Sequence, residues 1–165
     1  MKRSKRRQGA RRTDLPSGSF PRSTVRLDVG EYRIDLTLDE QHMIKAGAAA
    51  LAMLQQTRVR SWDLWMTVAE SLWILRLKVI YAIGGQLPVG RTYNLAFGEA
   101  MHLFGLYTDK ATRSRLFDCL EHRSEIESWR ASLDPAERRK LTHPASVWRH
   151  WKASRQQSNS PEPPR

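Results

Sequence analysis

Residues 61–83 read SWDLWMTVAESLWILRLKVIYAI. Apolar side chains recur three and four residues apart along this stretch, which is the spacing of one face of an α-helix. Ser61 is a favourable N-cap and Gly84-Gly85 ends helices readily, so we expect one long helix between them. Because its apolar face is broad, we expect this helix to be the spine of the core. The face comprises Trp62, Trp65, Met66, Ala69, Leu72, Trp73 and Ile80.

The same stretch carries four charged residues. A charged side chain costs about 2.5–3.5 kcal/mol at the centre of a bilayer. The sequence therefore argues against a membrane span here, and we expect no membrane partner. The charged residues are Asp63, Glu70, Arg76 and Lys78.

Upstream, apolar and charged residues alternate with period two in two short runs on either side of Val29-Gly30. This alternation predicts a small β-hairpin. We expect the hairpin to cover one side of the core or to mediate a homodimer. The apolar members are Val25, Leu27, Tyr32, Ile34 and Leu36.

Thr37 and Glu40 have the spacing of a capping box, which marks the start of a helix. Apolar or small residues at helical spacing follow and predict a helix to about Arg58. They are Ile44, Gly47, Ala48, Leu51 and Leu54.

Downstream, two helices are predicted on either side of Gly105. The first carries Tyr93, Phe97, Ala100, Met101 and Phe104 and stops at Gly105. The second is capped by Thr108 and carries Ala111, Leu116, Cys119 and Leu120. Because the connection is short, we expect these two helices to be neighbours in space.

Three shorter helices are predicted after these. Their start signals are Ser124 with Glu127, Asp134-Pro135 with Glu137, and Thr142 leading through His143-Pro144.

These patterns predict a mainly all-α fold, a compact bundle of about five to seven helices with a small N-terminal β-hairpin and disordered termini. Residues 1–24 are rich in Arg, Lys, Ser, Gly and Pro and predict a disordered basic arm. Residues 25–154 form the predicted single helical domain, and residues 155–165 a disordered tail.

The chain has a formal net charge of +11, and most of the surplus lies in its first 26 residues. Such a surplus attracts polyanions, and cations on an extended segment neutralise phosphates whatever the base sequence. We therefore expect the arm to contact nucleic acid through Lys2, Arg3, Lys5, Arg6, Arg7, Arg11 and Arg12. A localisation signal or a solubilising tail is the alternative use of the arm.

Residues 105–116, GLYTDKATRSRL, resemble the turn and second helix of helix-turn-helix proteins, although Tyr107 is one residue too many. The resemblance implies a helix in the major groove, with Ala111 and Leu116 turned inward. Base edges or phosphates would then be contacted by Lys110, Thr112, Arg113 and Arg115. The alternative is a plain helix hairpin, with these charges in solvent.

A second basic cluster surrounds Trp148 and Trp151 near the C-terminus. The tryptophans lie at helical spacing with Val147, which favours packing on the core over stacking on exposed bases. We expect a secondary basic patch at Arg149, Lys152 and Arg155, preceded by Arg138, Arg139 and Lys140.

The segment Leu141–Lys152, LTHPASVWRHWK, is similar to the closing segment of uncharacterised proteins of alphaproteobacterial plasmids and phages. Trp129-Arg130, followed by Leu133 and Arg138-Arg139, resembles the same proteins. The resemblance covers roughly residues 60–152 and implies an accessory or regulatory protein of a mobile element. It implies no site residues.

No pattern of catalytic chemistry is apparent, and we expect a protein that is not an enzyme and has no cofactor and no metal. The five histidines are scattered, and Cys119 with His122 supplies two ligands where a structural zinc site needs four. The single cysteine allows no internal disulfide, and no apolar run follows the N-terminal charges as in a secretory signal. We expect a cytoplasmic location, at the nucleoid in a bacterium, with nuclear or organellar targeting by the arm as the alternative.

The sequence therefore predicts a non-catalytic DNA-binding protein, an accessory regulator of a mobile element, of transcription or of replication. DNA is favoured over RNA as the partner. One alternative is an adaptor or structural protein that binds an acidic protein. Another is an RNA-binding component whose C-terminal tryptophans stack on unpaired bases.

Overall fold

The computed structural model describes residues 24–57, 59–85 and 87–158. The predicted arm, apart from Thr24, and the last seven residues of the chain lie outside this range.

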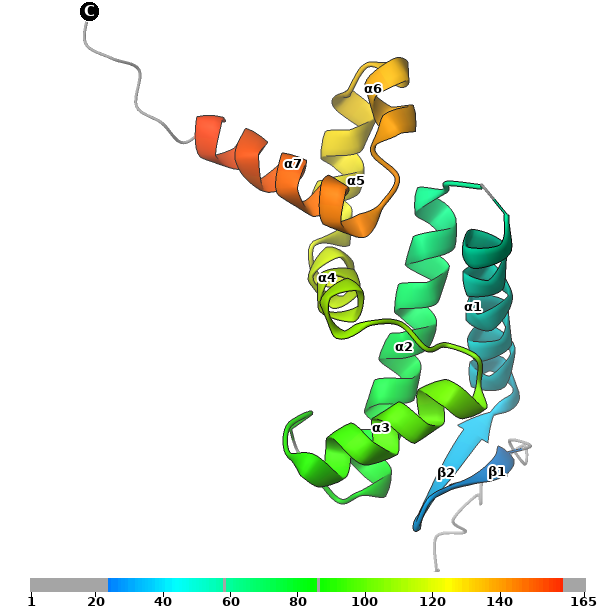
Figure 1. Cartoon of the computed structure of the whole chain (residues 1–165). Coiled ribbons are helices and arrows are strands. Elements are labelled where there is room, and N and C mark those ends of the chain that lie inside the picture. The colour runs from blue at the N-terminus through cyan, green and yellow to red at the C-terminus, as the bar shows by residue number, and fades with distance from the viewer. Residues whose placement is uncertain (1–23, 58, 86, 159–165) are drawn as a thin grey trace, which may run out of the picture.

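Within the described residues the fold is mainly helical, with one two-stranded antiparallel sheet at its N-terminal end (Figure 1). This confirms the predicted fold class. None of these helices is both long enough and apolar enough to cross a bilayer. The elements are β1 (Thr24–Val29), β2 (Tyr32–Thr37), α1 (Leu38–Gln56), α2 (Trp62–Ala82), α3 (Arg91–Leu103), α4 (Lys110–Glu121), α5 (Arg123–Ser132), α6 (Pro135–Lys140) and α7 (Pro144–Ser158).

The hairpin forms where the alternation predicts it. Its strands pair Val29 with Tyr32, and Gly30 takes a φ of +57° at the first position of the two-residue turn. A glycine suits this position because a side chain is strained at positive φ. The buried face, with Val29, Ile34 and Leu36, packs on the helices. The hairpin therefore covers one end of the core, as predicted.

Helices α1 and α2 form the centre of the molecule and lie side by side (Figure 1). The predicted capping box begins α1: the Glu40 N–H donates to Thr37 Oγ1 at 3.2 Å, and the Thr37 N–H donates to Glu40 Oε2 at 2.8 Å. Gly47 of α1 faces Ser71 of α2, and the Ser71 hydroxyl donates to the carbonyl of Met43 at 2.7 Å. The absence of a side chain at Gly47 lets the two helices approach closely.

The predicted spine helix is confirmed as α2, capped by Ser61. One predicted core residue is wrong, because Trp73 is 40% exposed. Its ring meets Phe117 of α4 edge-on, and the guanidinium of Arg76 lies over both rings. Trp73 thus lies at the edge of the core, between α2 and α4, with part of its ring in solvent.

Helices α5, α6 and α7 form the C-terminal part of the described chain at the far end from the hairpin (Figure 1). Asp134 caps α6 with Pro135 as its first residue, as predicted. The predicted Ser124 cap of α5 is wrong, because α5 begins at Arg123, directly after α4, and leaves no room for a capping turn. Helix α7 continues to Ser158, past the predicted domain end at residue 154.

Candidate nucleic-acid interface

Helix α4 carries the residues predicted to contact nucleic acid. It packs mainly against α2 and α7 rather than against α3. The helices on either side of Gly105 meet through Arg113 of α4, which lies against Phe97 and Met101 of α3, but they do not pack along their length, so the expectation that they are neighbours holds only in part. Gly105 does end α3, with a φ of +67°. The buried side chain of Leu106 holds the connection on the core. Figure 1 shows this connection passing across α2 between the end of α3 and the start of α4.

The start of α4 also differs from the prediction. Asp109, not Thr108, is the N-cap: the Thr112 N–H donates to Asp109 Oδ1 at 2.9 Å. Thr108 is buried, and its hydroxyl has no partner among the described residues. Ala111 is exposed rather than inward. It lies five positions before buried Leu116, which puts the two about 140° apart around the helix.

The capping role of Asp109 predicts a pH-dependent stability. Hydrogen bonds from Thr112, through its side chain and its backbone N–H, hold the pKa of Asp109 below its usual value. A lowered folded pKa contributes stability above the usual pKa, and this contribution is lost as the pH falls through the lowered value. Asp109→Ala should therefore destabilise the fold at neutral pH but not in strong acid, when urea denaturation is compared across pH. Thr108→Val should leave the stability nearly unchanged at both pH values. A larger loss of stability for Thr108→Val than for Asp109→Ala would mean that Thr108 is the cap.

Two of the four predicted α4 residues are held by contacts within the fold. Arg113 Nη1 donates to the carbonyl of Thr108 at 3.2 Å, and the guanidinium lies 5.6 Å from the ring centroid of Phe97. Arg115 Nη1 pairs with Asp118 Oδ2 at 2.9 Å. Thr112 is half-buried, whereas Lys110 is exposed. On the described surface of α4, Lys110 is thus the predicted cation that remains fully available to a ligand.

Helix α7 packs on the core through Val147 and Trp151, which are buried, as its helical spacing predicts. Trp148 is half-buried, and its ring centroid lies 5.0 Å from that of Trp151. The imidazole of His122, at the end of α4, lies against both rings. The prediction that these tryptophans pack the last helix on the core is confirmed for Trp151, which is buried, and in part for Trp148, which is half-buried.

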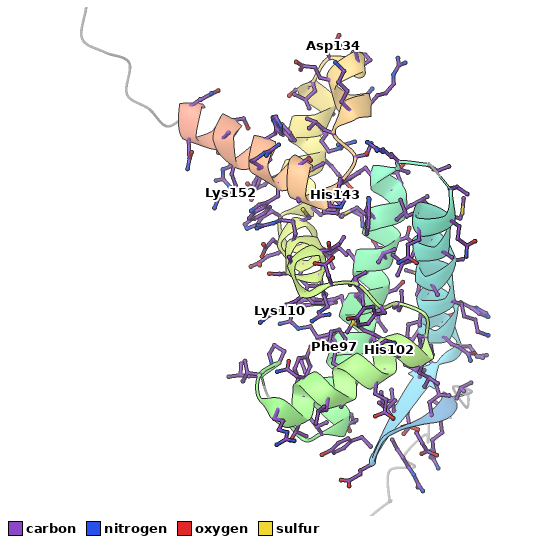
Figure 2. All side chains as sticks on the ribbon, viewed as in Figure 1. Phe97, His102, Lys110, Asp134, His143 and Lys152 are labelled. Carbon is purple, nitrogen blue, oxygen red and sulfur yellow. The ribbon has the colours of Figure 1, made fainter. Side chains whose placement is uncertain are left out.

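The two predicted basic regions meet around Trp148. Arg115 of α4 and Lys152 of α7 lie 5.4 and 5.6 Å from its ring centroid. Figure 2 shows Lys110 and Lys152 along the same side of the molecule. We call this the α4–α7 surface, defined by Lys110, Arg115, Trp148, Arg149 and Lys152.

Not all cations of the predicted secondary patch are available on the α4–α7 surface. Arg155 pairs with Glu125 at 2.7 Å and lies over the Trp151 ring. Arg149 and Lys152 are exposed and make no ion pair with another described residue. The sequence identifies these residues but does not place them beside α4, because the two helices in contact are far apart along the chain. A hint of the contact is that each helix carries apolar residues at helical spacing, Leu116 and Cys119 on α4 and Val147 and Trp151 on α7.

The arm residues predicted to contact phosphate lie outside the described residues. They are Lys2, Arg3, Lys5, Arg6, Arg7, Arg11 and Arg12. Their part in binding stays a prediction from the sequence.

The single cysteine of the chain lies inside the core. Cys119 is fully buried beside the carbonyl of Pro144, and burial raises the pKa of its thiol to about 12. A thiol with such a pKa stays protonated at neutral pH and is a poor nucleophile. Within residues 24–57, 59–85 and 87–158, three or more His, Cys, Asp or Glu side chains nowhere gather as a metal site would need.

Comparison with protein-family models, with curated proteins and with solved structures gives no match, so the candidate interface is defined by geometry and charge.

Proposed function

We propose that this chain is a non-catalytic nucleic-acid-binding protein that contacts the phosphates of duplex DNA. The observation that carries the proposal is the α4–α7 surface, where half-buried Arg115 of α4 and exposed Lys152 of α7 lie over the ring of Trp148, with exposed Lys110 on the same side of the molecule (Figure 2). The strongly basic sequence of residues 1–23 adds to the same attraction. The plasmid or phage setting implied by the resemblance is compatible with such a role.

Phosphate contact is supported better than the reading of bases. Arg113, one of the four residues predicted to contact base edges or phosphates, donates instead to the carbonyl of Thr108 and lies against Phe97 of α3. Lys110, Arg149 and Lys152 are exposed cations on long flexible stems, which suit point contacts with phosphate oxygens. The proposal therefore expects weak sequence preference from this surface.

Duplex DNA is preferred over single-stranded RNA for a related reason. Trp151 is buried, and the ring of Trp148 already has the cations of Arg115 and Lys152 over it. An unpaired base would have to displace one of these cations to stack there. Stacking of an unpaired base on Trp148 is thus disfavoured, whereas the cations can contact the phosphates of a duplex without leaving the ring.

The test is the loss of single charges from the α4–α7 surface. Lys110→Gln and Lys152→Gln should each lower the slope of log affinity against log salt by about 1, because each removes one phosphate contact. Fluorescence anisotropy with a labelled duplex measures the slope. Lys45→Gln removes an exposed lysine of α1 and is the matched control. If all three variants keep the salt slope of the wild type, the α4–α7 surface does not contact DNA.

The ion pairs of the site favour a second candidate function. Arg115 pairs with Asp118 and Arg155 with Glu125, so basic side chains here already bind carboxylates. An acidic protein segment could be bound in the same way by an adaptor. Affinity for duplex DNA that falls with salt supports the first function, whereas no DNA affinity at low ionic strength leaves the adaptor.

A further inference from the structure

A second basic feature lies at the start of α2, away from the α4–α7 surface. It is a pocket of about 410 Å³ lined by four arginines from three parts of the chain. We call it the arginine pocket, defined by Arg60, Arg130, Arg138 and Arg139. Arg60 precedes α2, Arg130 lies in α5, and the other two lie in α6.

Arg130 is the unusual member, because it is charged and only 8% exposed. Its guanidinium donates to the carbonyl of Leu141 and lies 5.0 Å from the ring centroid of Trp62. It makes no ion pair with any residue of the described chain, and burial lowers its pKa. A buried guanidinium without a counterion is costly, so the site is electrostatically incomplete as it stands.

The start of α2 adds donors beside this charge. Ser61 caps the 21-residue helix and lines the pocket, and a helix N-terminus favours an anion. Trp62 also lines the pocket and is 95% buried, since its exposed fraction is 5%. Its indole Nε1–H has no acceptor among the described residues. Buried N–H groups in folded proteins normally have an acceptor, so this donor is an unsatisfied polar group in the wall behind the pocket.

The acidic side chains of the pocket do not neutralise its arginines. Asp63 and Glu127 line the same cavity. Glu127 is engaged by Arg123 at 2.6 Å, and Asp63 raises the pKa of Arg130 without pairing with it. Arg60, Arg138 and Arg139 make no ion pair with another described residue. The cavity therefore keeps an excess of positive charge.

We infer that the arginine pocket binds a phosphate monoester. Several guanidinium groups and a helix N-terminus match the charge and the planar, two-oxygen geometry by which arginine recognises phosphate. The volume accommodates a phosphate with part of its ester group. The phosphate can belong to a free small molecule or to the end of a nucleic-acid strand, and the experiment separates these two sources.

The experiment titrates the full chain with inorganic phosphate and with a nucleoside 5′-monophosphate, followed by calorimetry. Arg60→Gln and Arg139→Gln should each weaken binding about tenfold, the size of one charge-assisted hydrogen bond. Arg91→Gln removes an exposed arginine at the start of α3 and should change nothing. This comparison also isolates the pocket from the arginines of residues 1–23. Phosphate binding that is equal in all variants, or no binding at all, would overturn the inference.

The second arm of the experiment uses one duplex with and without a 5′-terminal phosphate. If the ligand is a strand end, the phosphorylated duplex binds more tightly to the wild type, and Arg139→Gln removes the difference. If the ligand is a small molecule, both duplexes bind equally while the monophosphate still depends on Arg139. Because Lys110→Gln and Lys152→Gln leave the pocket intact, phosphate binding by those variants shows the pocket independently of the α4–α7 surface.

Discussion

Gly47→Ala should destabilise the protein by about 2–3 kcal/mol, although alanine normally stabilises a helix relative to glycine. A Cβ at residue 47 would collide with the Cβ and Oγ of Ser71 and would lie 3.3 Å from the carbonyl of Thr67. Neither obstacle is the far end of a flexible chain, so α1 and α2 would have to separate. Urea denaturation at neutral pH measures the loss.

The chain offers a matched control for Gly47→Ala. Gly98 also lies inside a helix, α3, but a Cβ there would meet nothing within 4 Å. Gly98→Ala should therefore stabilise the protein by roughly 0.5–1 kcal/mol. In a Ser71→Gly background, which removes the colliding atoms, Gly47→Ala should lose most of its cost. A cost for Gly47→Ala that persists in that background would show that the close approach of α1 and α2 is not its cause.

Trp151→Ala should cost about 3–5 kcal/mol of stability, because it removes a large buried side chain from the junction of α7 with α4. Trp151 is 4% exposed and contacts Trp148, His122 and Arg155. Chemical denaturation followed by circular dichroism measures the effect. A cost close to that of an exposed residue would mean that α7 is not docked through this ring.

Trp148→Ala separates binding from stability at the same junction. Its ring is half-buried, so the loss of stability should be nearer 1 kcal/mol. The ring also positions Arg115 and Lys152, and contacts of this kind are worth about 0.5–1 kcal/mol at exposed sites. Duplex affinity should fall about threefold. If Trp148→Ala binds DNA as the wild type does, the tryptophan has only a structural role.

The sequence predicts the parts of this fold that depend on neighbours along the chain. The capping box of Thr37 and Glu40, the turn at Gly30 and the stop at Gly105 each need only local geometry, and each is present. Thr108 and Asp109 show the limit of local reasoning, since both residue types cap helices well. Burial of Thr108 decides between them, and burial depends on how the connection from Leu106 packs.

The candidate sites depend on contacts that the sequence does not join. The α4–α7 surface brings together residues that the sequence analysis treats as a primary and a secondary site. The arginine pocket is assembled from a loop, α5 and α6, and its buried Arg130 looks in the sequence like any surface arginine of a short helix. The pairing of Arg115 with Asp118 has a local signal, since the two lie three residues apart on one helix, whereas the inward turn of Arg113 has none.

The central claim is that this protein binds nucleic acid through exposed positive charge. The most direct test measures the affinity of the intact chain for a short DNA duplex across a series of salt concentrations. The account predicts binding at low ionic strength, with log affinity falling linearly and steeply with log salt. An intact chain that does not bind the duplex at low ionic strength, or binds it with an affinity independent of salt, would contradict it.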